Sequence, residues 1–196
     1  GGVVGENAAI IAAGMKATVS IVDKSPQRLK ELHSKFGDAI IPFQSDEIDL
    51  NELINNCDLL IGSVLVPGAN APKLVSKEMI GSMKRGSVIV DVAIDQGGCV
   101  ETSKPTTHAE PTYMVDDVVH YCVTNMPGGV PMTATLALNA ATLPFVLKIA
   151  QEGYKNALAR DSNFLAGLNV CQGNITYKAV ANDLNYKYVS ASSAIN

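Results

Sequence analysis

A carboxylate at the end of an apolar run is the strongest chemical signal in the sequence. The stretch GSVIVDVAIDQGGC, residues 86–99, is rich in valine and isoleucine over 87–94 and then reaches Asp95, an amide and two glycines. Such a run is typical of a strand buried on both faces of a parallel sheet. Because ligands of open parallel sheets bind at the carboxyl ends of the strands, we expect Asp95 to face a binding site.

The first residues carry a second pattern, GGVVGENAAIIAAG at 1–14. Gly2 and Gly5 match the second and third glycines of the dinucleotide-binding turn G-x-G-x-x-G, and the first glycine and its strand are expected before residue 1. Gly2 would let the backbone approach a pyrophosphate, and Gly5 would let a helix pack tightly on a strand. The amides of Val3 and Val4 would point at the phosphates. An ordinary strand-to-helix turn explains the glycines alone equally well.

An acid at the end of the next strand favours the dinucleotide interpretation. Residues 17–22 (ATVSIV) are predicted to form a strand that ends at Asp23, 18 residues after Gly5. A spacing of about 20 residues is typical of the acid that binds the adenosine ribose. A carboxylate there accepts from the 2′-hydroxyl and repels a 2′-phosphate, which predicts NAD rather than NADP. In the alternative interpretation, Asp23 is an ordinary turn residue, and Lys24 and Arg28 are solvated cations rather than neighbours of the adenosine.

Strands and helices alternate through the first half of the chain. Further strands are predicted at 39–43, 59–65 and 87–94, and helices at 26–36, 50–56 and 72–83. Ser25 and Pro26 are a suitable cap and first residue for the helix at 26–36. This order predicts the α/β class with a Rossmann-like, doubly wound parallel sheet.

The second half has a different pattern. A polar loop at 100–111 precedes short strands at 113–115 and 118–123, and one long helix is predicted from residue 131 or 132 to about 150. Apolar residues surround most of that helix, so we expect it to be buried between two masses, with a kink at Pro144. Short helical pieces follow at 164–169 and 177–184. The domains are therefore expected at 1–130 and 131–196.

Composition excludes several classes of protein. The net charge of −4 argues against nucleic acid or an anionic membrane as the main partner. Apolar runs of about 18 residues without charges or turn formers are missing, so no membrane-spanning helix is predicted. The four cysteines are scattered, which favours a reduced, cytoplasmic protein over a disulfide framework or a metal site: Cys57, Cys99, Cys122 and Cys171.

Five segments together resemble the alanine dehydrogenase family. They are VDVAIDQGGC at 90–99, ETSKPTTHAEPTY at 101–113, NMPGGVP at 125–131, SVLVPGANAPKLV at 63–75 and GLNVCQGNITYKAVA at 167–181. The likeness covers essentially the whole chain. The nicotinamide-binding part of proton-translocating transhydrogenase is similar in its sheet, but it lacks the pair that stands here as Asp95-Gln96.

The resemblance implies an NAD-dependent enzyme that interconverts L-alanine and pyruvate plus ammonium, usually as a homohexamer. It implies that residues 131–196 belong to a substrate domain and that Asp95 is catalytic. Besides Gly2 and Gly5, the cofactor contacts that it implies are Val3, Val4, Asp23, Arg28, Ser45, Val64, Leu65, Val92, Ala93, Ile94, Asp95, Lys104, Val123, Thr124, Asn125 and Met126.

Other titratable residues are weaker candidates. The catalytic histidine and the substrate-binding arginine and lysine of the family have no matching motif here. We expect His33 on a helix surface, His120 in a structural role and His108 near Asp95 without a catalytic role. Asp91 should point elsewhere in the pleat, and Cys99 should be a buried, inert thiol.

Two interpretations of function stay open. The first is an amino-acid dehydrogenase in which Asp95 positions water or stabilises an iminium. In the second, Asp95 is only a cap or a ribose-binding acid, and the chain is a catalytically silent NAD-binding module of the transhydrogenase type.

Overall fold

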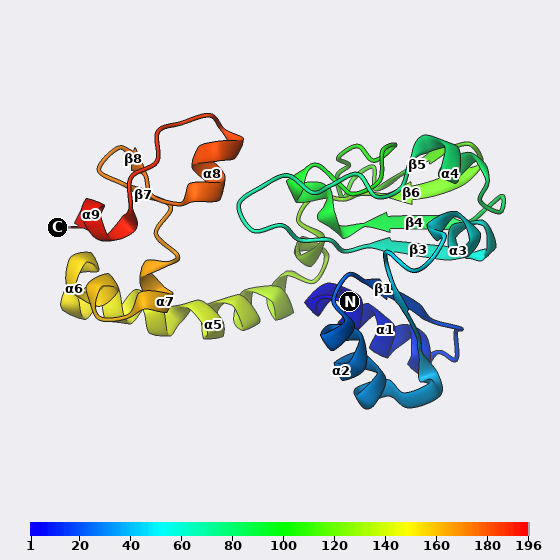
Figure 1. The fold of residues 1–196 in the computed structure, drawn as a ribbon, viewed down its shortest axis with the longest axis horizontal. Coiled ribbons are helices and arrows are strands. Elements are labelled where there is room, and N and C mark those ends of the chain that lie inside the picture. The colour runs from blue at the N-terminus through cyan, green and yellow to red at the C-terminus, as the bar shows by residue number, and fades with distance from the viewer. Residues whose placement is uncertain (196) are drawn as a thin grey trace. The chain divides into compact units, whose positions relative to one another are not determined.

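The computed structural model describes residues 1–195, which divide into two compact units (Figure 1). The first unit comprises Gly1–Leu65 and Ala71–Met126. The second comprises Val66–Asn70 and the described residues from Pro127 onward.

The first unit contains two separate sheets (Figure 1). Strands β1 (Ser20–Asp23) and β2 (Ile41–Gln44) pair in parallel. The other sheet has the order β3-β4-β6-β5, with bounds Leu59–Gly62, Val88–Asp91, Val118–Tyr121 and Thr112–Val115. Strands β3, β4 and β6 are parallel, and β5 pairs antiparallel with β6.

The expectation of one doubly wound sheet is therefore correct only in part. The parallel pairing and the alternation with helices are present, but no hydrogen bonds join the β1-β2 pair to the four-stranded sheet. In a doubly wound sheet, the strand before the first helix pairs with a strand on each side. Among residues 1–195, helix α1 (Val3–Gly14) follows Gly2 directly, so no such strand joins the two sheets.

Helix α2 (Pro26–Phe36) confirms the predicted start and end. The Ser25 hydroxyl accepts the Arg28 N–H at 3.2 Å, and Pro26 occupies the first turn. Leu32 of α2 is buried in a small core with Ala9 of α1, Ile21 of β1 and Ile40, which directly precedes β2. The short 3₁₀ turn η1 (Gly37–Ala39) then leads into β2.

A larger core lies under the four-stranded sheet. Helix α3 (Leu50–Asn56), confirmed as predicted, contributes Ile54, and helix α4 (Lys77–Gly81) contributes Ile80. The strands and the loops around them contribute Val75, Met83, Ile89, Val100 and Val118. Because these side chains come from segments far apart in sequence, their packing stabilises the four-stranded sheet and the positions of its strand ends.

The predicted helix at 72–83 is wrong at its start, because only Lys77–Gly81 is helical. The Ser76 hydroxyl caps α4 by accepting the Met79 N–H at 3.3 Å. The residues before Ser76 run extended beside the loop after β4, with a parallel bridge between Val75 and Val100. The backbone of the residues before Ser76 therefore forms hydrogen bonds with that loop instead of the bonds of a helix.

The predicted strand at 87–94 is also shorter, since β4 ends at Asp91. The 3₁₀ helix η2 (Val92–Gln96) follows, and the Asp91 carboxylate accepts the Ala93 N–H at 3.1 Å. Strands β5 and β6 confirm the predicted pair near 113–115 and 118–123. Asp116 and Asp117 form their tight turn with φ of 51° and 61°.

The second unit is mostly helical. It contains α5 (Pro131–Glu152), α6 (Tyr154–Ala159), α7 (Ser162–Leu165), α8 (Lys178–Asp183) and α9 (Ala191–Ile195). The 3₁₀ turn η3 (Met126–Gly129) precedes them, and β7 (Val170–Cys171) pairs antiparallel with β8 (Asn174–Ile175). Its core is small: Leu158, Cys171 and Ile195, with Phe164, Leu165 and Leu168 against them.

Helix α5 has the predicted extent, but the expectation that it is buried is wrong. None of its 22 residues is buried, and Leu136 and Leu138 are 61% and 66% exposed. The small core of the second unit is insufficient to enclose a helix that is apolar around its circumference. By length and composition α5 could also cross a membrane, contrary to the expectation from apolar runs, although many core helices of soluble proteins pass the same test.

Candidate functional site

The predicted site residues of the first unit gather where parallel strands end. Asp23 ends β1, and Ser45 directly follows β2. The segments after the other parallel strands contain the remaining candidates: Val64 and Leu65 after β3, Val92 to Asp95 after β4, and Val123 to Met126 after β6. This carboxyl edge is where open parallel sheets bind ligands.

The glycine turn connects two of these strand ends. The Gly1 amine donates to the Val22 carbonyl at 3.3 Å, which holds the turn against β1. A Cβ added to Gly1 would lie 2.7 Å from Asp23 Oδ2, and one added to Gly5 would lie 3.0 Å from Ser63 Oγ beyond β3. Side chains at Gly1 and Gly5 would therefore push α1 away from the strands.

The start of α1 is open and carries unpaired amides. The first bond within the helix joins the Glu6 N–H to the Gly2 carbonyl at 2.9 Å, so the amides of Val3, Val4 and Gly5 have no helical acceptor. A Cβ on Gly2 would meet nothing within 4 Å, and Val3 is 79% exposed. Free amides at the positive end of a 12-residue helix fit an anion such as a pyrophosphate.

Asp23 lies beside this turn as a half-buried carboxylate. Burial raises its pKa, whereas the Ser25 N–H at 2.8 Å and the charge of Arg28 lower it. The Asp23 carbonyl also accepts the Ser45 N–H at 3.1 Å. Asp23 and Ser45 therefore lie at neighbouring strand ends, and Asp23 stays ionised at neutral pH.

Arg28 has structural partners that the sequence did not indicate. Its Nε donates to the Gly1 carbonyl at 2.7 Å, and its guanidinium pairs with Glu6 of α1 and Glu31 of α2. Hydrogen bonds to the two glutamates raise its pKa. Glu6, in the first turn of α1, also pairs with Lys35 of α2. The two ion pairs of Glu6 therefore connect α1 to α2. Arg28 thus stabilises the glycine turn through its bonds to the Gly1 carbonyl and to Glu6.

Asp95 is exposed in the turn after β4. It lies in η2, which is followed by Gly97 and Gly98 with φ of 87° and 74°, values that favour glycine. Within residues 1–195, its carboxylate has no hydrogen bond or ion pair. The neighbouring Gln96 Oε1 is buried without a partner in the same part of the chain. An unpaired carboxylate is available to a cationic or water-derived group.

Several of the other predicted contacts have side chains in the core. Ala93, Ile94 and Val123 are buried, so a cofactor could meet them only through their backbone. Val64 packs against the larger core, whereas Leu65 is 71% exposed.

The polar loop at 100–111 lies along the end of β6. The Thr106 N–H donates to the Cys122 carbonyl at 2.9 Å, and His108 Nε2 lies 3.1 Å from the Asn125 carbonyl. The Lys104 N–H donates to the Tyr113 hydroxyl at 2.8 Å, and its ammonium lies 4.5 Å from the Tyr113 ring centroid. The loop therefore brings His108 and Lys104 to the edge of the candidate site.

His120 has the structural role predicted for it. Its ring is fully buried in β6, with Nδ1 3.1 Å from the Val118 carbonyl and Nε2 2.7 Å from the Thr102 hydroxyl. It stacks on Tyr113 with 5.0 Å between ring centroids. Burial lowers the pKa of His120, against the opposite effects of the Val118 carbonyl and the Asp91 charge.

Cys99 fits the prediction of an inert thiol. Burial, followed by the nearby charge of Asp91, raises its pKa to about 12, so no thiolate forms at neutral pH. All four cysteines are free. In residues 1–195, groups of three or more potential metal ligands are absent.

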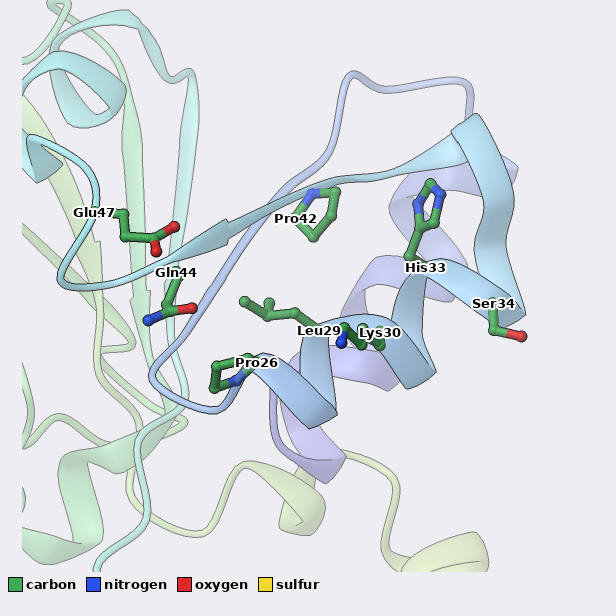
Figure 2. Close-up of a pocket in the computed structure, with 8 residues that line it drawn as sticks. All are labelled: Pro26, Leu29, Lys30, His33, Ser34, Pro42, Gln44 and Glu47. Carbon is green, nitrogen blue, oxygen red and sulfur yellow. The ribbon is translucent and has the colours of Figure 1, made fainter.

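A cavity of about 400 Å³ lies between α2 and β2 (Figure 2). Figure 2 shows exposed His33, on the surface of α2 as expected, at one end of this cavity. The other lining residues are Pro26, Leu29, Lys30, Ser34, Pro42, Gln44 and Glu47. None of the predicted site residues lines it, but Gln44 pairs with Asp23 across β1 and β2, so the cavity borders the candidate site.

Parallel strands, a glycine turn before a helix and an acid at the next strand end define a dinucleotide-binding domain. A family model described as "Alanine dehydrogenase/PNT, C-terminal domain" matches residues 1–178, and the chain belongs to this family. Domains of this family in general bind NAD(H).

Curated relatives carry the name alanine dehydrogenase. The chain is 57% identical over 195 residues to the alanine dehydrogenase of Halomonas elongata, and 52% identical over 196 residues to that of Bacillus subtilis. Each match covers 100% of this chain but only 53% and 52% of the relative. The chain therefore spans about half the length of these relatives.

Solved structures agree in fold. An L-alanine dehydrogenase superposes with a TM-score of 0.80 and 49% identity, covering 94% of this chain and 51% of that chain. A transhydrogenase from Sinorhizobium meliloti superposes with a TM-score of 0.67 and 31% identity, covering 79% and 43%.

Proposed function

We propose that the full-length protein is an NAD-dependent dehydrogenase that reversibly converts L-alanine to pyruvate and ammonium, and that this chain supplies its NAD-binding domain. The observation that carries the proposal is the exposed, unpaired carboxylate of Asp95. Asp95 follows β4, and the neighbouring strand β3 is followed by Ser63, against which Gly5 packs. The carboxylate and the glycine turn therefore belong to the ends of two paired strands. The names of the relatives at 57% and 52% identity support the choice of substrate.

The residues at the glycine turn fit NAD. The unpaired amides of Val3, Val4 and Gly5 suit the pyrophosphate, and Gly2 leaves open space for it. The ionised Asp23 suits a ribose 2′-hydroxyl and repels a 2′-phosphate, which favours NAD over NADP. The remaining contacts that we propose are Arg28, Ser45, Val64, Leu65, Val92, Ala93, Ile94, Asp95, Lys104, Val123, Thr124, Asn125 and Met126.

Held at the glycine turn and Asp23, NAD would supply the acceptor for the hydride that leaves the alanine Cα. Loss of that hydride leaves an iminium, to which water must add before ammonia leaves. The Asp95 carboxylate would stabilise the cation and hold the attacking water by accepting its proton. Its exposure and its lack of protein partners within residues 1–195 support this role.

The histidines of this chain do not supply the remaining acid–base group. His33 is exposed on α2, His120 is buried between Thr102 and Val118, and His108 contacts the Asn125 carbonyl. We therefore propose that catalysis needs groups from the half of the relatives' length that this chain does not span. A homo-oligomer and a cytoplasmic location are part of the same proposal, supported by the family resemblance and the four free cysteines.

The test is oxidation of L-alanine by the full-length protein, followed by nicotinamide absorbance. We expect reduction of NAD that depends on L-alanine, with much slower reduction of NADP. Pyruvate and ammonium should support the reverse reaction.

A non-catalytic NAD-binding module is the second candidate, favoured by the likeness to the transhydrogenase. NADH binding without any alanine-dependent reduction would favour this module and overturn the dehydrogenase.

A further inference from the structure

Behind the exposed Asp95 lies a second aspartate that is fully buried. The carboxylate of Asp91, the last residue of β4, accepts three backbone N–H groups. Oδ1 accepts from Ala93 at 3.1 Å, and Oδ2 accepts from Cys99 at 2.9 Å and Val100 at 3.1 Å. One side chain therefore binds the beginning and the end of the segment 92–100.

Two glycines make room for this carboxylate. A Cβ added to Gly98 would lie 2.7 Å from Asp91 Oδ2. A Cβ added to Gly62 of β3 would collide with Cys99 Sγ and lie 3.3 Å from Asp91 Oδ1. The Cys99 thiol itself lies 3.5 Å from Oδ1. The carboxylate is thus enclosed by the segment that it holds and by the neighbouring strand.

The same segment is held from its other side by residues 71–75. Lys73 Nζ donates to the Gly97 carbonyl at 2.6 Å and to the Val100 carbonyl at 3.2 Å. The Ala71 N–H donates to the Gln96 carbonyl at 2.8 Å. Asp95 lies between these fixed points, and its carboxylate has no hydrogen bond or ion pair among residues 1–195, so the backbone around it decides where its carboxylate lies.

The anchor needs an acceptor at both side-chain oxygens of residue 91. Burying a carboxylate without partners is costly, and three N–H donors offset that cost. An asparagine would keep one acceptor oxygen, but its NH₂ group would face either the Ala93 amide or the amides of Cys99 and Val100. At least one donor would then lie unpaired against another donor.

We propose that Asp91 is a positioning residue that holds the segment 92–100 so that the Asp95 carboxylate meets the substrate. This inference rests on the proposed dehydrogenase function. Asp91 itself is buried and touches neither substrate nor cofactor in this account.

The test compares the full-length Asp91→Asn variant with the wild type. We expect kcat for L-alanine oxidation to fall by roughly ten- to a hundredfold, because small misplacements of a catalytic group have effects of this size. The affinity for NADH should fall by a smaller factor than kcat, because the glycine turn and Asp23 are untouched although the proposed contacts at Val92 to Asp95 lie in the loosened segment. Amide hydrogen exchange should accelerate in the segment 92–100 and remain unchanged in α2.

Ser87→Ala is the matched control. Ser87 is also a buried polar residue, but it directly precedes β4 at the opposite end and donates to the Cys57 carbonyl at 3.2 Å. We expect this variant to lose some stability with unchanged kcat. If Asp91→Asn does not fold, Gly62→Ala disturbs the same anchor from β3 and should give the same fall in kcat with accelerated exchange at 92–100.

Three outcomes would overturn the proposal. They are an Asp91→Asn variant with wild-type kcat, one whose kcat falls no more than that of Ser87→Ala, and one with unchanged exchange at 92–100. If the wild type oxidises no alanine, the proposed function fails, and the exchange measurement still decides whether Asp91 holds this segment.

Discussion

A Cβ on Gly5 would lie 3.0 Å from the hydroxyl oxygen of Ser63, so the start of α1 rests against the loop that follows β3. This contact brings the unpaired amides of α1 to the carboxyl edge of the sheet. A side chain at residue 5 would require the Ser63 hydroxyl or α1 to shift by a few tenths of an ångström, which gives the third glycine of the turn a physical reason.

Replacing Gly5 should therefore weaken cofactor binding. In Gly5→Val, the stiff branched side chain must displace Ser63 or move α1 outward, and we expect the Kd for NADH to rise at least about tenfold, near 1.4 kcal/mol. NADH fluorescence titration of the full-length protein measures this. Gly14→Ala, in the same helix with nothing within 4 Å of its Cβ, is the control and should bind normally. Wild-type affinity in Gly5→Val would remove the glycine turn from the proposed site.

Asp23 should decide between the two nicotinamide cofactors. In Asp23→Ser, one charged hydrogen bond to the ribose is lost and the repulsion of a 2′-phosphate disappears. We expect the Kd for NADH to rise roughly tenfold or more and the Kd for NADPH to fall. Asp38→Asn changes an exposed acid of η1 and should alter neither value. An unchanged ratio of the two Kd values in Asp23→Ser would show that another residue selects the cofactor.

His120 should make the free energy of unfolding depend on pH. Burial lowers its pKa below the ordinary value of 6.5, so the unfolded chain takes up the proton first as the pH falls. Its contribution is complete above about pH 6.5 and declines below that value. Denaturant unfolding at several pH values should show a steeper decline for the wild type than for His120→Gln.

The exposed His33 provides the comparison for this experiment. His33→Gln should retain the wild-type decline because His33 lies on the surface of α2. Parallel profiles for the wild type and His120→Gln would contradict the role of burial at His120.

Local signals in the sequence predicted much of this fold. Ser25 and Pro26 determine where α2 begins, and this boundary agrees with the structure because a cap depends only on neighbouring residues. The glycines and Asp23 were likewise recognisable from spacing alone. Periodicity also predicted the extent of α5.

Features that depend on distant residues were not predictable. The segment before Ser76 fits a helix in its periodicity, but it pairs with the loop after β4 instead. The exposure of α5 follows from the size of the unit around it, which no local pattern reveals. Arg28 matches a cofactor-binding position, yet its partner Glu6 lies 22 residues away.

The anchoring role of Asp91 was not predicted from the sequence either. An aspartate inside a valine and isoleucine run, followed by two glycines, was a visible signal of a buried anchor. Its function depends on the amides of Cys99 and Val100 folding back over the strand end, eight and nine residues later. Alternation along a strand could predict only that its side chain points to the opposite face from Val90 and Val92.

The most direct test of the central claim is the Asp95→Asn variant of the full-length protein. The substitution keeps the shape of the side chain and removes its charge and basicity. We predict that NADH binding remains measurable while L-alanine turnover falls by roughly a hundredfold or more, the range for loss of a general acid–base group. Glu101→Gln, an exposed acid that accepts the Lys77 N–H at 2.7 Å, is the control and should turn over normally. Near-normal turnover in Asp95→Asn would contradict the account.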